Sequence, residues 1–197
     1  NDFDNAYEFY NKAIKYSPQY SPAYFRISKV YLKRKELLLA IESIEKGLSY
    51  DNSYYKEHYK LGRLYRKNNQ IELAKNSISK SIDINQKYTK AHFELGQIYY
   101  DEENFNKAIE AYNKAIETDS TFKKAYLTIG MSQLNKNNYR LAEQYFNDAI
   151  NLDNKYIDAY YRLINLYNIE KKYDLAKDIA KKSMYVKQNH PPILFEL

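Results

Sequence analysis

Six alanines recur along this chain at one constant interval, and this interval constrains the fold more than any other feature. A period of about 34 residues is typical of chains built from repeated supersecondary units, each of which packs on its neighbours. The sequence therefore predicts an array of repeats in place of one central core. The alanines are Ala6, Ala40, Ala74, Ala108, Ala142 and Ala176.

Further positions keep the same interval and indicate how the units pack. Small residues let helix backbones approach closely, and large residues fill the space between layers. One ladder holds only small residues: Ala13, Gly47, Ser81, Ala115, Ala149 and Ser183. A second holds only Ile or Leu: Ile27, Leu61, Leu95, Ile129, Leu163 and Leu197. A third holds Tyr31, Tyr65, Tyr99 and Tyr167, and Gln133 interrupts it.

Within one unit, from residue 89 to residue 122, apolar side chains recur three and four positions apart, as on one face of a helix. Polar runs at 101–104 and 118–121 follow these stretches and consist of turn and cap formers. Alternation with period two never persists, so β-structure is not expected. The sequence thus predicts an all-α fold of helical hairpins.

The order of residues within this unit resembles the tetratricopeptide repeat, whose unit is about 34 residues long. The match is carried by His92, Leu95-Gly96, Tyr99, Ala108, Tyr112 and Ala115. The resemblance implies a right-handed superhelical α-solenoid of stacked antiparallel helix pairs, with residues 1–197 as a single solenoid. It divides the chain into a half repeat at 1–20, repeats at 21–54, 55–88, 89–122, 123–156 and 157–190, and a partial helix at 191–197. We expect this array to be a piece of a longer protein.

Both ends of the array stop within a hairpin under this division, which leaves apolar side chains without a packing partner. Because a solenoid normally closes its ends with polar capping repeats, we expect end-to-end self-association. The side chains concerned are Tyr7 and Tyr10 at one end, and Ile193, Leu194 and Phe195 at the other. The chain also departs from the family pattern between units, where the expected proline survives only as Pro18.

Catalytic and metal chemistry find little support in the sequence. The chain has no cysteine, which excludes disulfides, thiolate catalysis and Cys-ligated zinc and is compatible with both cytoplasm and periplasm. His58 and His92 share a repeat position with three tyrosines, Tyr24, Tyr126 and Tyr160, which favours packing over catalysis. No Gly-rich phosphate loop occurs, and no run of roughly 20 apolar residues. We therefore expect no enzyme activity, cofactor, metal, small-molecule substrate or membrane span.

The binding surface follows from the resemblance. In the resembled family, the first helix of each hairpin lines a concave groove that holds a peptide or a partner segment. The positions that correspond here, with their basic neighbours, are Phe25, Arg26, Lys29, Lys56, Tyr59, Lys60, Arg63, Arg66, Lys67, Lys90, Phe93 and Tyr161. Repeat 55–88 carries eight Lys/Arg against three Asp/Glu, whereas repeat 89–122 carries three against seven.

Basic side chains interleaved with aromatic ones suit a partner segment that bears carboxylates beside apolar anchors. The plainer interpretation is that these cations are ordinary solvated Lys and Arg, and that the rings pack across the groove. Some members of the resembled family clamp the carboxylates of chaperone tails with Lys, Asn and Arg, and the positions here do not match that set.

Two further functions stay open. A net charge of +6 and a pI near 9.1 are compatible with nucleic-acid binding by a helical repeat. The acidic repeat 89–122 would interrupt a track of phosphate contacts, and the first-helix residues change in chemistry from unit to unit, which counts against it. The other alternative is a structural or oligomerisation spacer within a larger protein.

Overall fold

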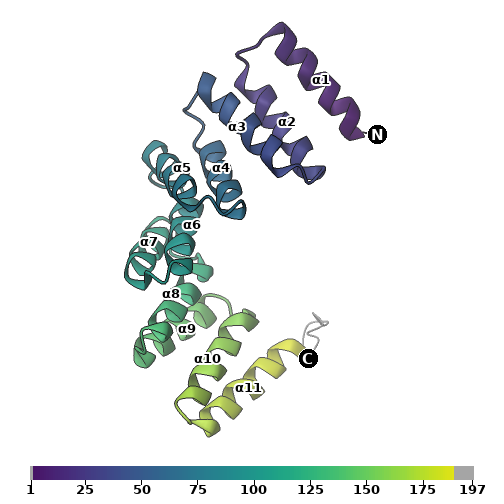
Figure 1. The fold of residues 1–197 in the computed structure, drawn as a ribbon. Coiled ribbons are helices and arrows are strands. Elements are labelled where there is room, and N and C mark those ends of the chain that lie inside the picture. The colour runs from purple at the N-terminus through teal and green to yellow at the C-terminus, as the bar shows by residue number, and fades with distance from the viewer. Residues whose placement is uncertain (1, 189–197) are drawn as a thin grey trace. The chain divides into compact units, whose positions relative to one another are not determined.

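The computed structural model describes residues 2–188, and over that range it contains α-helices and no β-strand. The expected all-α fold of helical hairpins is thereby confirmed (Figure 1). The first helices of the hairpins are α2 (Ser21–Lys33), α4 (Tyr55–Lys67), α6 (Thr89–Asp101), α8 (Lys123–Asn135) and α10 (Ile157–Ile169). The second helices are α1 (Asp2–Tyr16), α3 (Leu37–Tyr50), α5 (Ile71–Ile84), α7 (Phe105–Thr118), α9 (Tyr139–Leu152) and α11 (Tyr173–Gln188).

The turn inside each hairpin has a residue in the left-handed conformation at its centre. In the first hairpin this residue is Lys35, with φ of 65°, and the N–H of Glu36 closes the turn by donating to the carbonyl of Tyr31 at 2.9 Å. This bond satisfies one of the carbonyls that a helix end leaves unpaired. The same conformation returns once in each following repeat, at Asn69, Glu103, Asn137 and Lys171.

The turn between hairpins is held by a side chain where the family pattern expects a proline. The Asp51 carboxylate accepts the N–H of Ser53 at 2.9 Å, and this two-residue step is an Asx turn. Asn85, Asp119 and Asp153 make the same bond to the residue two positions later, at 3.1, 3.0 and 2.9 Å. At these four junctions the chain turns between repeats without a rigid ring, because an Asp or Asn caps each turn.

The helices form two compact units, residues 1–98 and residues 99–197, of which the structure describes 2–98 and 99–188. In the first unit, α2 packs on α3 and α4 packs on α5. Its core combines residues of both hairpins and of α6, among them Phe25, Ile44, Leu61, Ile78 and Ile98. In the second unit, α8 packs on α9 and α10 on α11, around a core with Phe146, Leu163 and Leu166 at its centre.

The alanine ladder lies where the two helices of a hairpin approach each other. Ala40, Ala74, Ala108 and Ala142 are fully buried. In the second hairpin, a methyl group added to Gly62 of α4 would lie 3.0 Å from the carbonyl oxygen of Ala74 on α5, and 2.6 Å from Ile78 Cγ1. The two backbones therefore run too close at this point for larger side chains.

The prediction of apolar ends is tested only in part. Tyr7 packs on α2, with its ring centroid 5.7 Å from that of Tyr31 and its hydroxyl 3.2 Å from the Tyr31 hydroxyl, so this ring has a packing partner. Among residues 4–16 of α1, the exposed aromatic residues are Phe9 and Tyr16. Ile193, Leu194 and Phe195, like the whole of the predicted partial helix 191–197, lie outside the described residues. Self-association stays a prediction.

Candidate interaction surface of the first helices

Five basic residues project into solvent from three consecutive first helices of the first unit. They are Arg26 and Lys29 on α2, Lys56 and Lys67 on α4, and Lys90 on α6. Lys56 Nζ lies 5.7 Å from the centroid of the Tyr55 ring, a cation–π contact that leaves its charge uncompensated. In the part of the chain that the structure describes, no carboxylate lies within ion-pair distance of any of the five.

The other predicted cations of α4 are paired with acids. Arg66 Nη1 donates to Glu94 Oε1 at 2.8 Å, and Arg63 Nε lies 3.5 Å from Glu94 Oε2. Glu94 sits on α6 and is only 8% exposed, so its carboxylate is held between the two helices by both guanidinium groups. A buried carboxylate requires such partners, because burial alone strongly disfavours its charge.

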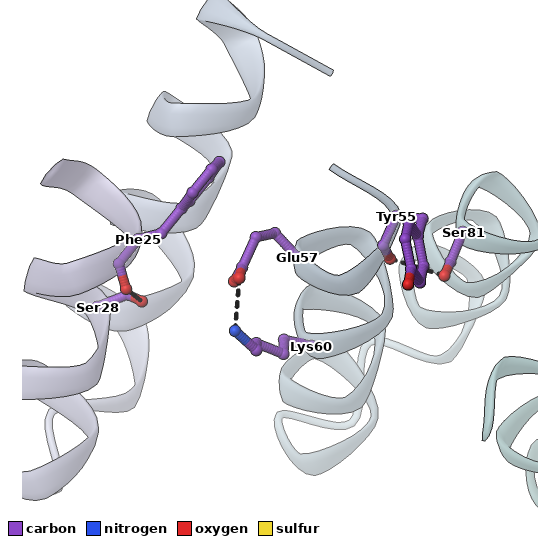
Figure 2. A network of polar contacts seen from close by, with 6 residues as sticks. All are labelled: Phe25, Ser28, Tyr55, Glu57, Lys60 and Ser81. Atoms are coloured by element: carbon purple, nitrogen blue, oxygen red, sulfur yellow. Dashed lines mark hydrogen bonds and ion pairs between the residues drawn. The ribbon is translucent and has the colours of Figure 1, made fainter. Parts of the chain in front are cut away.

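Lys60 is paired within its own helix. Its ammonium group contacts the carboxylate of Glu57, one turn earlier on α4, at 2.5 Å. Figure 2 shows both side chains projecting from α4 on the side that faces the helix carrying Phe25 and Ser28. Lys60 therefore contributes less positive charge to the surface than a free lysine would, while part of its side chain stays accessible.

The aromatic residues of the predicted surface divide into a buried one, two half-buried ones and an exposed one. The assignment of Phe25 is corrected, because its side chain is 6% exposed and belongs to the core. Its ring fills the space in which a side chain at Gly47 would lie, and packs on Tyr54 with centroids 5.0 Å apart. Because Gly47 has no side chain, it leaves room for the Phe25 ring inside the core.

Tyr59 and Phe93 are half-buried and present only part of their rings. The Tyr59 ring packs edge-on against Tyr88, with centroids 5.2 Å apart, and the guanidinium of Arg63 lies 5.7 Å from its centroid. Burial raises the pKa of the Tyr59 hydroxyl, so it stays protonated at neutral pH. Tyr161 is 58% exposed, with the Arg162 guanidinium 5.9 Å from its centroid, and it belongs to the second unit.

The two histidines near this surface have a structural partner. His58 Nε2 lies 2.9 Å from the carbonyl oxygen of Asn52, and His92 Nε2 lies 2.8 Å from that of Gln86. In each case the acceptor is the residue six positions earlier, in the turn between hairpins. Tyr24, Tyr126 and Tyr160 bond the equivalent carbonyls, at 2.8, 3.1 and 3.1 Å. Both imidazoles thus have the structural role expected for them, and each bonds to the turn before its helix.

The described residues offer neither a metal site nor a membrane-spanning helix. Across residues 2–188, no three His, Cys, Asp or Glu side chains come together in a group able to hold a metal ion. None of the helices within that range combines the length and the apolar character that a bilayer-spanning helix needs.

Sequence reasoning identified the cations but missed the role of Glu94. One signal was available: Glu94 lies one repeat length after Lys60, so the two occupy equivalent positions on consecutive first helices. An acid there faces the preceding first helix, where Arg63 and Arg66 lie. Net charge per repeat could not reveal this, because it counts Arg63 and Arg66 in one repeat and their neutralising acid in the next.

The chain combines stacked helical hairpins, capped turns and small residues at the helix crossings, and its first-helix surface changes from repeat to repeat. These features define a class of repeat proteins that act as scaffolds for protein–protein interaction. This chain belongs to the tetratricopeptide repeat family. Family models described as tetratricopeptide repeat match it at residues 1–20, 21–54, 58–88, 89–122 and 123–156.

Solved structures agree with this assignment. A crystal structure of MamA is 30% identical over 78% of this chain and 90% of its own, with a TM-score of 0.74. MamA from Desulfovibrio magneticus RS-1 is 14% identical over 87% of this chain and 97% of its own, with a TM-score of 0.77. YrrB, described as a TPR protein with an unusual peptide-binding site, is 20% identical over 92% of this chain and 93% of its own, with a TM-score of 0.72. No curated protein sequence matches the chain.

Proposed function

We propose that this chain binds a segment of a partner protein across the first helices of its first unit, and that the segment combines acidic and apolar side chains. The observation that carries the proposal is the set of five exposed, unpaired cations on α2, α4 and α6: Arg26, Lys29, Lys56, Lys67 and Lys90. An excess of accessible positive charge favours partners that bring Asp and Glu, and speeds their association.

Tyr59 and Phe93 contact the apolar side chains of the partner segment. Both rings are half-buried and the Tyr59 ring packs on Tyr88, so a partner side chain can cover their remaining surface at little cost in side-chain entropy. The peptide-binding site named for YrrB supports a peptide ligand for a protein of this fold. Catalysis is no part of the proposed function, because His58 and His92 are both committed to turn carbonyls.

A charge-reversal experiment tests the proposal. The variant carries Lys29→Glu, Lys56→Glu and Lys90→Glu, one on each first helix. Its control carries Lys12→Glu, Lys15→Glu and Lys80→Glu, which change the net charge equally at exposed positions of the second helices α1 and α5. The probe is a fluorescein-labelled peptide of alternating Asp and Phe, with a Lys-Phe peptide and a single-stranded RNA as comparisons, and anisotropy reports binding.

We expect the wild-type chain and the control to bind the Asp-Phe peptide, and the first-helix variant to bind it at least about tenfold more weakly. Circular dichroism checks that all three chains are equally helical. Equal binding by the two variants would contradict the proposed surface. Preference for the RNA over the acidic peptide would instead favour the nucleic-acid alternative, with an affinity that falls steeply as salt rises.

A further inference from the structure

Glu94 is an acidic residue that is almost entirely buried. Its side chain is 11% exposed, close to the 13% of Glu57, and it faces two arginines of the neighbouring helix. It also lies on the first-helix side of the first unit, among the basic residues to which we assign the binding of an acidic partner. A buried charge at such a place needs a reason, since a neutral residue would avoid the desolvation cost.

The contacts of Glu94 match those that an acidic ligand would make. Its two carboxylate oxygens face two different arginines of the neighbouring helix, Oε1 toward Arg66 at 2.8 Å and Oε2 toward Arg63 at 3.5 Å. The arginines are not enclosed by this pairing: the side chain of Arg63 is 59% exposed and that of Arg66 is 27% exposed. Arg63 in particular keeps a large accessible surface for a partner, while its guanidinium already contacts a carboxylate.

The Tyr59 ring helps to hold this arrangement in place. Arg63 lies over the ring of Tyr59, which is itself packed on Tyr88, so its guanidinium has an apolar support on one side and Glu94 on another. Glu94 is too deeply buried to contact a partner itself. Its effect on binding is therefore electrostatic: it reduces the positive potential that the two arginines present to solvent.

We propose that Glu94 is a specificity-determining residue, an internal carboxylate that competes with the acidic side chains of the partner for Arg63 and Arg66. The inference rests on the proposed function, because it concerns the same surface and the same class of acidic partner. With Glu94 in place, the exposed cations without a carboxylate partner include Lys29, Lys56 and Lys90, and an acidic residue of the partner is directed toward these lysines in preference to the arginine pair.

The test replaces Glu94 by residues that remove its charge. Glu94→Gln keeps the size of the side chain and one acceptor for Arg66, and Glu94→Thr introduces the residue that this chain has at the equivalent position, Thr128. The control is Glu143→Gln, which changes the net charge equally in the second unit, where Glu143 accepts the Tyr167 hydroxyl at 2.8 Å. The affinity for the Asp-Phe peptide is measured at low and at high salt, together with the thermal stability of each variant.

We expect both Glu94 variants to bind the Asp-Phe peptide about fivefold more tightly than the wild type at low salt, with a gain that shrinks as salt is added. Glu143→Gln should leave the affinity unchanged. A purely structural Glu94 would lower the thermal stability when replaced and leave the affinity and its salt dependence as they were, and that result would overturn the inference alone. If neither the wild type nor the Glu94 variants bind the peptide, both the inference and the proposed function fail.

Discussion

Either tyrosine or histidine occupies one position of each repeat, because both can reach the same backbone carbonyl. Their common partner, the residue six positions earlier, lies in the turn that joins one hairpin to the next. An O–H or N–H group at the end of a flat ring therefore ties each first helix to the turn before it. A histidine at this position differs from a tyrosine in one respect: it can take up a proton as the pH falls, so its contribution to stability depends on pH.

His58 provides a test of this point. Burial lowers the pKa of the His58 imidazole below its usual 6.5, an effect that the bond to Asn52 only partly offsets. The unfolded chain therefore takes up a proton before the folded chain does as the pH falls. The stability that His58 contributes is fully present above pH 6.5 and declines as the pH drops below that value.

We predict that His58→Tyr removes this part of the acid sensitivity, because a tyrosine stays neutral and can donate to the same carbonyl. Urea unfolding of wild type and variant at about pH 7.5 and about pH 5 measures the difference. The gap between the two free energies of unfolding should shift in favour of His58→Tyr on acidification. His58→Phe serves as the control, since it lacks the hydrogen bond at every pH. A gap that does not change with pH would refute the assignment.

At the scale of helices and turns, the chain repeats one geometry with several residue types. The turn inside each hairpin requires a positive φ, and Asn69 and Asn137 suit it because asparagine tolerates the left-handed region. Lys35, Glu103 and Lys171 occupy the same position although a long side chain gains nothing from that conformation. The strain at these three sites is tolerated because the hydrogen bonds on either side fix the turn.

We predict that Lys35→Asn stabilises the chain by about 0.5 kcal/mol, since asparagine is less strained at positive φ and costs less than glycine in the unfolded state. The matched control is Lys33→Asn, the same substitution two residues earlier at the last residue of α2, where asparagine is a poorer helix former than lysine. Thermal or urea unfolding should show opposite signs for the two variants. A destabilising Lys35→Asn would mean that the lysine makes a favourable contact.

The sequence predicts the repeat length, the helical hairpins and the small residues at their crossings, because all of these recur at a fixed interval and reinforce one another. It does not predict that Phe25 is buried, because that depends on the empty space above Gly47, which is a glycine only in this repeat. Nor does it predict that Glu94 neutralises Arg63 and Arg66, since that contact joins helices of different repeats. Features that repeat along the sequence can thus be predicted from the sequence alone. The burial of Phe25 and the pairing of Glu94 cannot, because they depend on which residues are neighbours in three dimensions.

At the scale of the whole molecule, each hairpin draws its stability from itself and its immediate neighbours, as in other repeat proteins. The two compact units have cores made of different residues, one around Ile44 and Ile78 and the other around Phe146 and Leu163. Damage to one core is therefore expected to stay local.

We predict that Ala142→Leu destabilises the second unit by about 1–3 kcal/mol through overpacking, because Ala142 is fully buried at the crossing of α8 and α9. Native-state hydrogen exchange should become faster in α8 to α10 and remain unchanged in α2 to α4. The mirror variant, Ala40→Leu in the first unit, should reverse the pattern. Faster exchange along the entire chain after either substitution would show that the array unfolds as one cooperative block.

The Asx turns between hairpins have a consequence for how such a chain can change in length. Asp51, Asn85, Asp119 and Asp153 each begin the same short bend, so the segments between them are interchangeable in their end geometry. Loss or duplication of one whole repeat between any two of these bends restores the same junction, whereas a shift by a single position breaks every bond across it. Recombination at these sites would therefore produce longer or shorter arrays that still fold, each with a different order of charges along its first helices.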